Sequence, residues 1–202
     1  MRVALDWDGT VTEVDTLHMV LERFGDPDVF DRVEEGLRRG TVSYRECMEV
    51  EMASVRAPVE EVNAWLAERA RMRPGFAELA RGHDVLVLSS GFEELIRPLL
   101  AREGVDVEVV ANRVDPSPAG WRVVWRDASE CPECRDVCKR RLLPPDAYVY
   151  AGDGYSDRCA ALAARRVFAR DGLADWLRGQ NIRFETFSDL RDIAGALAPG
   201  RR

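Results

Sequence analysis

Two acidic residues directly follow the first apolar segment of the chain. Residues 3–5 (VAL) lead into Asp6 and Asp8, and Gly9 and Thr10 then favour a tight turn. Alternate side chains of a strand point to the same side, so both carboxylates are expected to face one site. Two carboxylates held together repel each other, and one ionises reluctantly unless a cation lies beside them. The segment therefore predicts a charged reaction site, and its simpler alternative is a strand that ends in a polar turn.

One basic residue differs in type from all the others. Lys139 is the single lysine among the 29 lysines and arginines of the chain. A position that keeps lysine against such a bias indicates a need for a compact ammonium group, which arginine lacks. Lys139 lies shortly before the apolar segment 148–151, which is followed by Asp153 and Asp157. A lysine that remained by chance is the alternative, but chance would have to place it at this one basic position.

A third apolar segment also ends in polar residues. Residues 85–88 (VLVL) are followed by Ser89, Ser90 and Gly91. A hydroxyl and free N–H groups ahead of a helix suit a phosphate oxygen, and glycine lets the backbone approach a ligand closely. Taken alone, the segment is typical of an ordinary helix cap. However, parallel strands end at one edge of a sheet, where ligands bind, so the three polar strand ends predict one shared site.

The pattern of the surrounding chain predicts how these segments are positioned. Strand-like segments alternate with helical patterns, which predicts an α/β fold with a Rossmann-like, doubly wound and mainly parallel sheet. Strands are expected at 3–7, 84–89, 105–111, 148–152, 166–169 and 183–186, with half of a small hairpin at 121–125. Helices are expected at 93–102, 135–143, 156–164, 173–178 and 190–197.

Between residues 15 and 74 the strand patterns stop, and four amphipathic helices are predicted instead. The first carries an apolar stripe with helical spacing, and the others begin at Asp26, Ser43 and Pro58. We therefore expect a helical cap at 15–74, inserted into an α/β core formed by residues 1–14 and 75–202.

Composition narrows the classes of function. The chain has 202 residues, a net charge of -7 and 32% charged residues, which is ordinary for a globular protein and argues against nucleic-acid binding. No apolar run approaches the roughly 20 residues that span a membrane, and no signal peptide is recognised, so a cytoplasmic protein is expected. With 2 histidines in the chain, carboxylates are expected to carry the acid–base chemistry.

Three cysteines lie just ahead of the single lysine, at Cys131, Cys134 and Cys138. They could bind zinc, with Cys159 or a carboxylate as the fourth ligand, although a second Cys-x-x-Cys pair is missing. Reduced thiols that pack around Lys139 are the interpretation we favour, and a disulfide is a third alternative.

Together, these segments resemble the haloacid dehalogenase superfamily of phosphohydrolases. Its four motifs are similar, in order, to residues 6–10 (DWDGT), Ser89, Lys139 and residues 152–157 (GDGYSD). The helical insert is similar to the cap of the phosphoserine-phosphatase-like branch. The cysteines ahead of Lys139 resemble those of methionine-salvage enolase-phosphate phosphatases and of phosphoethanolamine/phosphocholine phosphatases. The resemblance therefore covers the whole chain.

The resemblance implies a two-step hydrolysis. Asp6 would attack phosphorus and become an aspartyl-phosphate. Asp8 would protonate the departing alkoxide and then accept a proton from the attacking water, a division of roles that needs two carboxyl groups with different pKa values. Because the dehalogenase and transport-ATPase branches lack the second acid, Asp8 argues for phosphate-ester hydrolysis.

The resemblance also implies the groups that bind phosphate and metal. The phosphoryl oxygens would be held by Lys139, Ser89, Ser90 and Gly91. Mg²⁺ suits a site with few carboxylates, and the expected ligands are Asp6, the main-chain carbonyl of Asp8, and Asp153. Asp157 would act through a water molecule or orient Lys139.

The expected substrate is a small phosphorylated metabolite. Asp15 stands nine residues after the nucleophile, where phosphoserine phosphatases carry a glutamate that reads the substrate amine. The shorter side chain argues against phosphoserine and leaves a cationic leaving group open, whereas a helix N-cap is the structural alternative. A phosphotransferase with the same aspartyl-phosphate, and a non-catalytic module that binds zinc or a phosphoryl ligand, are the competing functions.

Overall fold

The computed structural model describes residues 2–143 and 148–198. Within them, seven strands form one sheet in the order β4-β3-β2-β1-β5-β6-β7. The strands are β1 (Arg2–Leu5), β2 (Asp84–Phe92), β3 (Glu108–Asp115), β4 (Arg122–Val124), β5 (Tyr148–Gly152), β6 (Arg166–Ala169) and β7 (Glu185–Thr186). All neighbours are parallel except β3 and β4, the predicted hairpin. The chain extends from β1 first to one side and then to the other, which confirms the doubly wound α/β fold.

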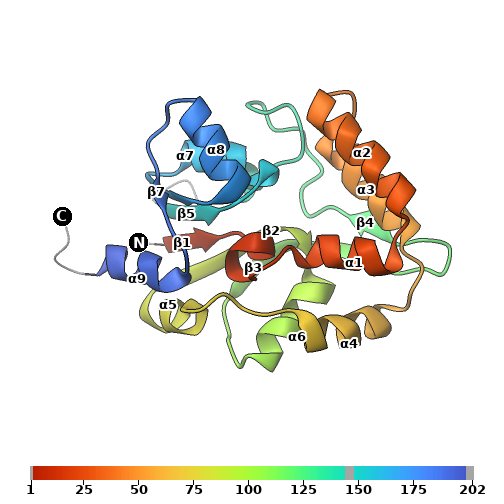
Figure 1. Cartoon of the computed structure of the whole chain (residues 1–202), viewed down its shortest axis with the longest axis horizontal. Coiled ribbons are helices and arrows are strands. Elements are labelled where there is room, and N and C mark those ends of the chain that lie inside the picture. Colours follow the sequence, from red (N-terminus) through yellow and green to blue (C-terminus); the bar gives the residue numbers. More distant parts are fainter. Residues whose placement is uncertain (1, 144–147, 199–202) are drawn as a thin grey trace.

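Helices cover both faces of this sheet (Figure 1). Helices α5 (Phe76–Gly82), α6 (Glu93–Arg102) and α9 (Leu190–Leu197) cover one face, and α7 (Arg158–Ala163) and α8 (Asp171–Gly179) cover the other. Side chains alternate along a strand. Val3 and Leu5 of β1 therefore join the first apolar cluster, whereas Ala4 joins the second. Helix α5 was not predicted from the sequence.

The predicted insert between β1 and β2 contains four helices in the described chain: α1 (Thr16–Phe24), α2 (Pro27–Arg39), α3 (Tyr44–Ser54) and α4 (Val59–Arg69). The side chains of Asp15, Asp26 and Ser43 accept N–H bonds at the starts of α1, α2 and α3, as their capping sequences predict. Figure 1 shows α2 and α3 side by side, projecting beyond the sheet. None of the helices in the described ranges is long and apolar enough to cross a membrane.

The insert shares its apolar interior with the core. Buried Val20, Met52 and Leu66 belong to the same cluster as the side chains beneath the sheet. The buried Trp121, just ahead of β4, donates from its indole N–H to the carbonyl of Ala57 at 2.9 Å. Its backbone N–H also bonds the carbonyl of Met52 at 3.1 Å, so the end of α3 is held against the core.

The first motif differs from the sequence prediction in its local structure. β1 ends at Leu5, and a tight turn over Trp7–Val11 follows. Gly9 takes φ 73°, and a Cβ at this position would collide with the Asp153 carboxylate. The expected strand alternation of Asp6 and Asp8 is therefore wrong. The turn, rather than the pleat of a strand, brings the two acids to one cavity.

The predicted helix at 135–143 is also wrong. The chain makes a short 3₁₀ helix at Lys139–Leu142, preceded by Cys138 in extended conformation. Arg135 takes φ 62°, in the left-handed region. A right-handed helix cannot continue across a residue in this conformation. The segment is instead folded back by hydrogen bonds between Cys131 and the residues at 135 and 136.

Candidate active site

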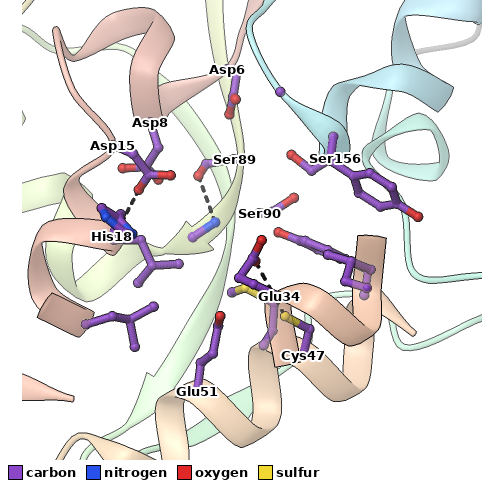
Figure 2. Close-up of a pocket in the computed structure, with 18 of the residues that line it drawn as sticks. Asp6, Asp8, Asp15, His18, Glu34, Cys47, Glu51, Ser89, Ser90 and Ser156 are labelled. Atoms are coloured by element: carbon purple, nitrogen blue, oxygen red, sulfur yellow. Dashed lines mark hydrogen bonds between the residues drawn. The ribbon is translucent and has the colours of Figure 1, made fainter. Parts of the chain in front are cut away.

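The three polar strand ends lie around one cavity of about 280 Å³, between the carboxyl edge of the sheet and helices α1 to α3. Figure 2 shows Asp6, Asp8 and Ser89 at the sheet side of this cavity and Glu34 and Glu51 at the side of the insert. The turn after β1 supplies Asp6 and Asp8, β2 supplies Ser89, and the 3₁₀ helix supplies Lys139. The sequence thus predicted correctly that these residues meet.

Lys139 lies at the centre of a buried ion network. Its ammonium is 2.5 Å from Asp6 Oδ1 and 2.7 Å from Asp157 Oδ1, and its side chain is 2% exposed. Burial opposes a charge at this position, but the carboxylates of Asp157 and Asp6 raise the pKa of Lys139 above its usual value. Lys139 therefore stays charged and holds the Asp6 carboxylate in place.

Asp157 is fully occupied by hydrogen-bond donors. Oδ1 accepts from Lys139 and from the hydroxyl of Tyr150 at 2.6 Å. Oδ2 accepts the backbone N–H groups of Asp153 and Gly154, both at 2.9 Å. Because both oxygens are satisfied, Asp157 suits the expected task of orienting Lys139 better than that of a metal ligand.

Asp6 and Asp153 carry an excess of negative charge. Carboxylate oxygens of Asp6, Asp153 and Asp157 all lie within 4.8 Å of one another, with the Lys139 ammonium as their counter-charge. Burial, then repulsion from Asp157, raises the pKa of Asp6 well above its usual value and that of Asp153 to about 7. A hard divalent cation bound by oxygen atoms would relieve this repulsion, so the donor set fits Mg²⁺.

Asp8 has a separate environment, against the first residue of α1. Its Oδ1 accepts the backbone N–H of Thr16 at 2.9 Å and also the Thr16 hydroxyl. Burial, and secondly the neighbouring Asp15 carboxylate, raise the pKa of Asp8 to about 7. A carboxyl group with this pKa can hold or release a proton near neutral pH, as a general acid and base must.

The end of β2 forms a narrow polar turn. The Ser89 hydroxyl accepts the backbone N–H of Gly91 at 2.8 Å, and Asn112 donates to the Ser90 carbonyl at 2.8 Å. A Cβ on Gly91 would lie 3.1 Å from Ser89 Oγ and 3.2 Å from Asp8 Oδ2. The absence of a side chain at Gly91 therefore keeps the cavity open between the two strand ends.

Asp15 is a helix N-cap that also lines the cavity. Its carboxylate accepts the backbone N–H of His18 at 2.8 Å and caps α1. Asp15 and His18 also line the cavity (Figure 2). A contact of Asp15 with substrate stays a prediction.

Sequence reasoning missed two groups around the site. Arg73 is 7% exposed and donates to the carbonyls of Thr10 at 2.8 Å and Gly9 at 2.7 Å, so it holds the turn after Asp6. An arginine has no distinguishing signal in a chain so rich in arginine. Glu51, on the cavity side of α3, is 4% exposed, and its Oε1 has no hydrogen-bond partner. Glu51 reaches the cavity only because of how the insert packs on the core, so the sequence carries no signal for its position.

Glu51 should make the stability of the protein depend on pH. Burial, then repulsion from Glu34, raises the pKa of Glu51 from 4.5 to about 8. Folding therefore favours the protonated form, and the stability gained below the unfolded pKa is lost as pH rises through about 8. We expect the unfolding free energy of Glu51→Gln, measured relative to wild type, to rise by on the order of a few kcal/mol from about pH 5 to about pH 8.

Urea unfolding of both proteins at the two pH values measures this difference. Glu46→Gln, an exposed position on the same helix, is the matched control and should change little. An equal effect of the two substitutions at both pH values would contradict the raised pKa of Glu51.

Comparison with known proteins agrees with this geometry. Residues 3–162 match the family model of haloacid dehalogenase-like hydrolases. The chain belongs to this family. The family match thus spans the turn after β1, β2, Lys139 and the end of β5.

Several proteins similar to this chain are phosphatases. It is 29% identical to polyol phosphate phosphatase PYP1 of Saccharomyces cerevisiae, over 95% of this chain and 90% of that protein. It is 28% identical to 2-hydroxy-3-keto-5-methylthiopentenyl-1-phosphate phosphatase of Exiguobacterium sibiricum, with 95% of each chain covered. A solved substrate-bound phosphoserine phosphatase complex has the same fold, with a TM-score of 0.70, 17% identity and 98% of each chain covered. The prediction of a phosphoric monoester hydrolase is confirmed.

Proposed function

We propose that the chain is a Mg²⁺-dependent phosphatase that hydrolyses small phosphorylated metabolites through an aspartyl-phosphate at Asp6. The observation that carries the proposal is the buried Asp6 carboxylate, 2.5 Å from the Lys139 ammonium and facing the same cavity as Asp8. Covalent phosphate-ester hydrolysis requires a nucleophile held in place, here Asp6 by the Lys139 ammonium. It also requires a neighbouring acid with a pKa near neutrality, here Asp8 with a pKa of about 7.

The residues divide the reaction into two steps. Asp6 attacks phosphorus while Lys139 and the turn at Ser89 hold the phosphoryl oxygens. Asp8 enters the first step protonated and donates its proton to the departing alkoxide. In the second step the Asp8 carboxylate takes a proton from water, which attacks the aspartyl-phosphate and restores Asp6. The raised pKa of Asp8 supports both proton transfers.

Asp6, the main-chain carbonyl of Asp8, and Asp153 would hold the metal ion. When bound, Mg²⁺ supplies positive charge that offsets the carboxylates and the phosphoryl group. Thr10 donates to Asp153 Oδ1 at 2.8 Å, which leaves Oδ2 free of that bond and fixes the orientation of the carboxylate. We also propose that the insert at 15–74 acts as the cap that excludes water from this site.

Substitution of Asp153 should weaken the metal site selectively. We expect Asp153→Asn to raise the Mg²⁺ concentration for half-maximal activity by about tenfold or more, because one anionic ligand is lost. Titration of Mg²⁺ into EDTA-treated enzyme, with turnover of para-nitrophenyl phosphate as the readout, measures the shift. Asp175→Asn is the matched control, since Asp175 is 79% exposed on α8. An unchanged Mg²⁺ requirement in the Asp153 variant would exclude Asp153 as a ligand.

The cap side of the cavity supports a particular class of leaving group. Among the described residues that line the cavity, Lys139 is the one permanent cation, and it belongs to the phosphate end. The other end carries Asp15, Glu34 and Glu51, with the unpartnered Glu51 Oε1 buried there. The carboxylates of Asp15 and Glu34 can accept hydrogen bonds from hydroxyl and ammonium groups and repel a substrate carboxylate, and Glu51, protonated near neutral pH, can exchange hydrogen bonds with a hydroxyl group. We therefore propose polyol or amino-alcohol phosphates as substrates.

A screen of phosphate esters at fixed Mg²⁺ tests this choice. Glycerol phosphate and phosphoethanolamine should exceed phosphoserine in kcat/KM by about tenfold or more, because phosphoserine adds a carboxylate next to the acidic groups. Equal or better turnover of phosphoserine would contradict the leaving-group assignment but not the phosphatase. Release of inorganic phosphate, compared with and without an acceptor alcohol, separates hydrolysis from phosphoryl transfer.

A further inference from the structure

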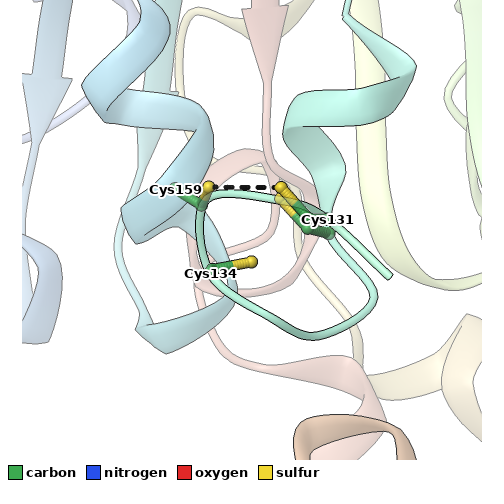
Figure 3. Close-up of side chains that lie close together, drawn as sticks. Cys131, Cys134 and Cys159 are labelled. Carbon is green, nitrogen blue, oxygen red and sulfur yellow. Dashed lines mark hydrogen bonds between the residues drawn. The ribbon is translucent and has the colours of Figure 1, made fainter. Parts of the chain in front are cut away.

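Four of the five cysteines converge outside the cavity. Cys131, Cys134, Cys138 and Cys159 each offer a sulfur atom, and these four atoms lie within 4.8 Å of one another. All four are free thiols. Figure 3 shows Cys159, which projects from α7, facing Cys131 and Cys134 of the loop ahead of the 3₁₀ helix. Residues 131–138 and residue 159 are distant in sequence, so only the fold completes this set.

The sulfur atoms lie close enough together to bind one tetrahedral metal ion. In a Zn²⁺ site with four thiolates, Zn–S bonds of about 2.3 Å place the sulfur atoms about 3.8 Å apart. The sulfur atoms of Cys131 and Cys159 lie 3.9 Å apart. This is about twice the bond length of a disulfide, roughly 2.05 Å. We propose that Cys131, Cys134, Cys138 and Cys159 bind one structural Zn²⁺ ion.

The backbone of the loop is bent to present two of these thiols. The N–H of Arg135 bonds the carbonyl of Cys131 at 2.8 Å, and the N–H of Cys131 bonds the carbonyl of Asp136 at 2.8 Å. These bonds close a tight turn over residues 131–136, in which Arg135 takes φ 62°, in the left-handed region. The turn holds the sulfur atoms of Cys131 and Cys134 within 4.8 Å of that of Cys159.

The charge around the cluster suits a zinc site. Four thiolates and one Zn²⁺ carry a net charge of about −2, which favours cationic neighbours. Two guanidinium groups lie near the cluster, that of Arg140, which pairs with Glu133 at 3.5 Å, and that of Arg141, which pairs with Asp127 at 2.8 Å. Because both already pair with a carboxylate, they would offset only part of the charge that zinc thiolates introduce.

The position of the cluster suggests a structural role for the metal ion, next to Lys139 and Asp157. Cys138 directly precedes Lys139 and caps its 3₁₀ helix, accepting the N–H of Arg140 at 3.2 Å. Cys159 follows two residues after Asp157, which accepts from Lys139. A zinc ion would thus join the segment that carries the lysine to the segment that carries its carboxylate partner. The ion would then hold in place the segment of Lys139, which does not belong to the helix predicted at 135–143.

Metal analysis of the full-length protein tests the proposal without reference to activity. After purification under reducing conditions and dialysis into Mg²⁺ buffer, we expect about one zinc ion per chain. Cys134→Ser should lower this content by about tenfold or more, because serine is a poor zinc ligand, whereas Cys134→His should retain it. Cys47→Ser is the matched control, since Cys47 is the cysteine outside the cluster, and Asp153→Asn controls for zinc in the carboxylate site.

A spectroscopic measurement covers the case in which a variant does not fold. Wild-type protein loaded with Co²⁺ should show thiolate-to-cobalt charge-transfer absorption and the visible bands of tetrahedral coordination. Wild-type protein that lacks zinc after expression in zinc-supplemented medium, and shows no such cobalt spectrum, would overturn the proposal. Zinc that is lost in Asp153→Asn and kept in Cys134→Ser would overturn it as well. Neither result bears on whether the protein is a phosphatase.

Discussion

Substitution of Asp6 by asparagine should lower kcat for para-nitrophenyl phosphate by about 10⁴-fold or more. Asparagine keeps the size and the planar shape of the side chain but cannot form an acyl phosphate. The ion pair with Lys139 at 2.5 Å is also lost, so the neutral side chain is held less firmly. Initial rates at saturating Mg²⁺, together with quenched mass spectrometry of the wild-type protein for a phosphorylated Asp6, measure the effect.

The control for this variant separates chemistry from folding. Asp175→Asn makes the same change at an exposed position of α8 and should keep the wild-type rate. Circular dichroism should show that Asp6→Asn is folded, since removal of one of three clustered carboxylates relieves repulsion. Turnover of Asp6→Asn near the wild-type rate would rule out the covalent mechanism.

Substitution of Lys139 by arginine should abolish most activity although the charge is preserved. We expect a loss of about 10³-fold in kcat/KM, because a planar guanidinium cannot place one nitrogen between Asp6 and Asp157 in the space of an ammonium. The side chain is 2% exposed, so a larger group has no room to move aside. Steady-state kinetics of Lys139→Arg and of Lys139→Met measure this requirement.

Lys139→Met adds a stability effect that comes from the loss of charge, which arginine preserves. Without the ammonium, the buried carboxylates of Asp6 and Asp157 lose their counter-charge, and we expect the unfolding free energy to fall by about 3–5 kcal/mol. Arg141→Lys, the reciprocal change two residues away on a partly exposed side chain, should leave both activity and stability unchanged. If Lys139→Arg were fully active, the preference for lysine would have no chemical cause.

The insert and the core share one apolar interior, which limits how far the insert could move. Val20, Met52 and Leu66 pack in the same apolar cluster as the sheet, and Trp121 bonds the end of α3. Rigid rotation of the whole insert would expose this cluster to water. Helix α2, whose buried Val33 and Leu37 belong to a separate, smaller cluster, is less tied to this interior than α3.

The sequence was sufficient to predict the fold and the main components of the candidate site. Alternating strand and helix patterns predicted the doubly wound sheet, because periodicity follows directly from which face of an element is buried. Asp6, Ser89 and Asp153 were expected to meet because parallel strands end at one edge, and the cavity contains all three. The catalytic and metal-binding roles of these residues stay predictions.

Local signals failed where long-range contacts decide the conformation. The helix expected at 135–143 is absent, since the chain there follows hydrogen bonds and a left-handed Arg135 that its helical pattern does not reveal. Arg73 and Glu51 were missed for a similar reason. An arginine that binds backbone carbonyls and a glutamate buried in a cavity differ from surface residues only through their tertiary neighbours.

By itself, then, the sequence determined the α/β fold, the family and the residues expected to react, because these follow from local pattern and motif order. The tertiary structure alone decided that each oxygen of Asp157 accepts two hydrogen bonds and that Cys159 meets the cysteines ahead of Lys139. It also decided that Asp15, Glu34 and Glu51 line the insert side of the cavity. The physical reason is that such properties depend on the distance between atoms of segments far apart in the chain. Only the packed sheet and helices set that distance.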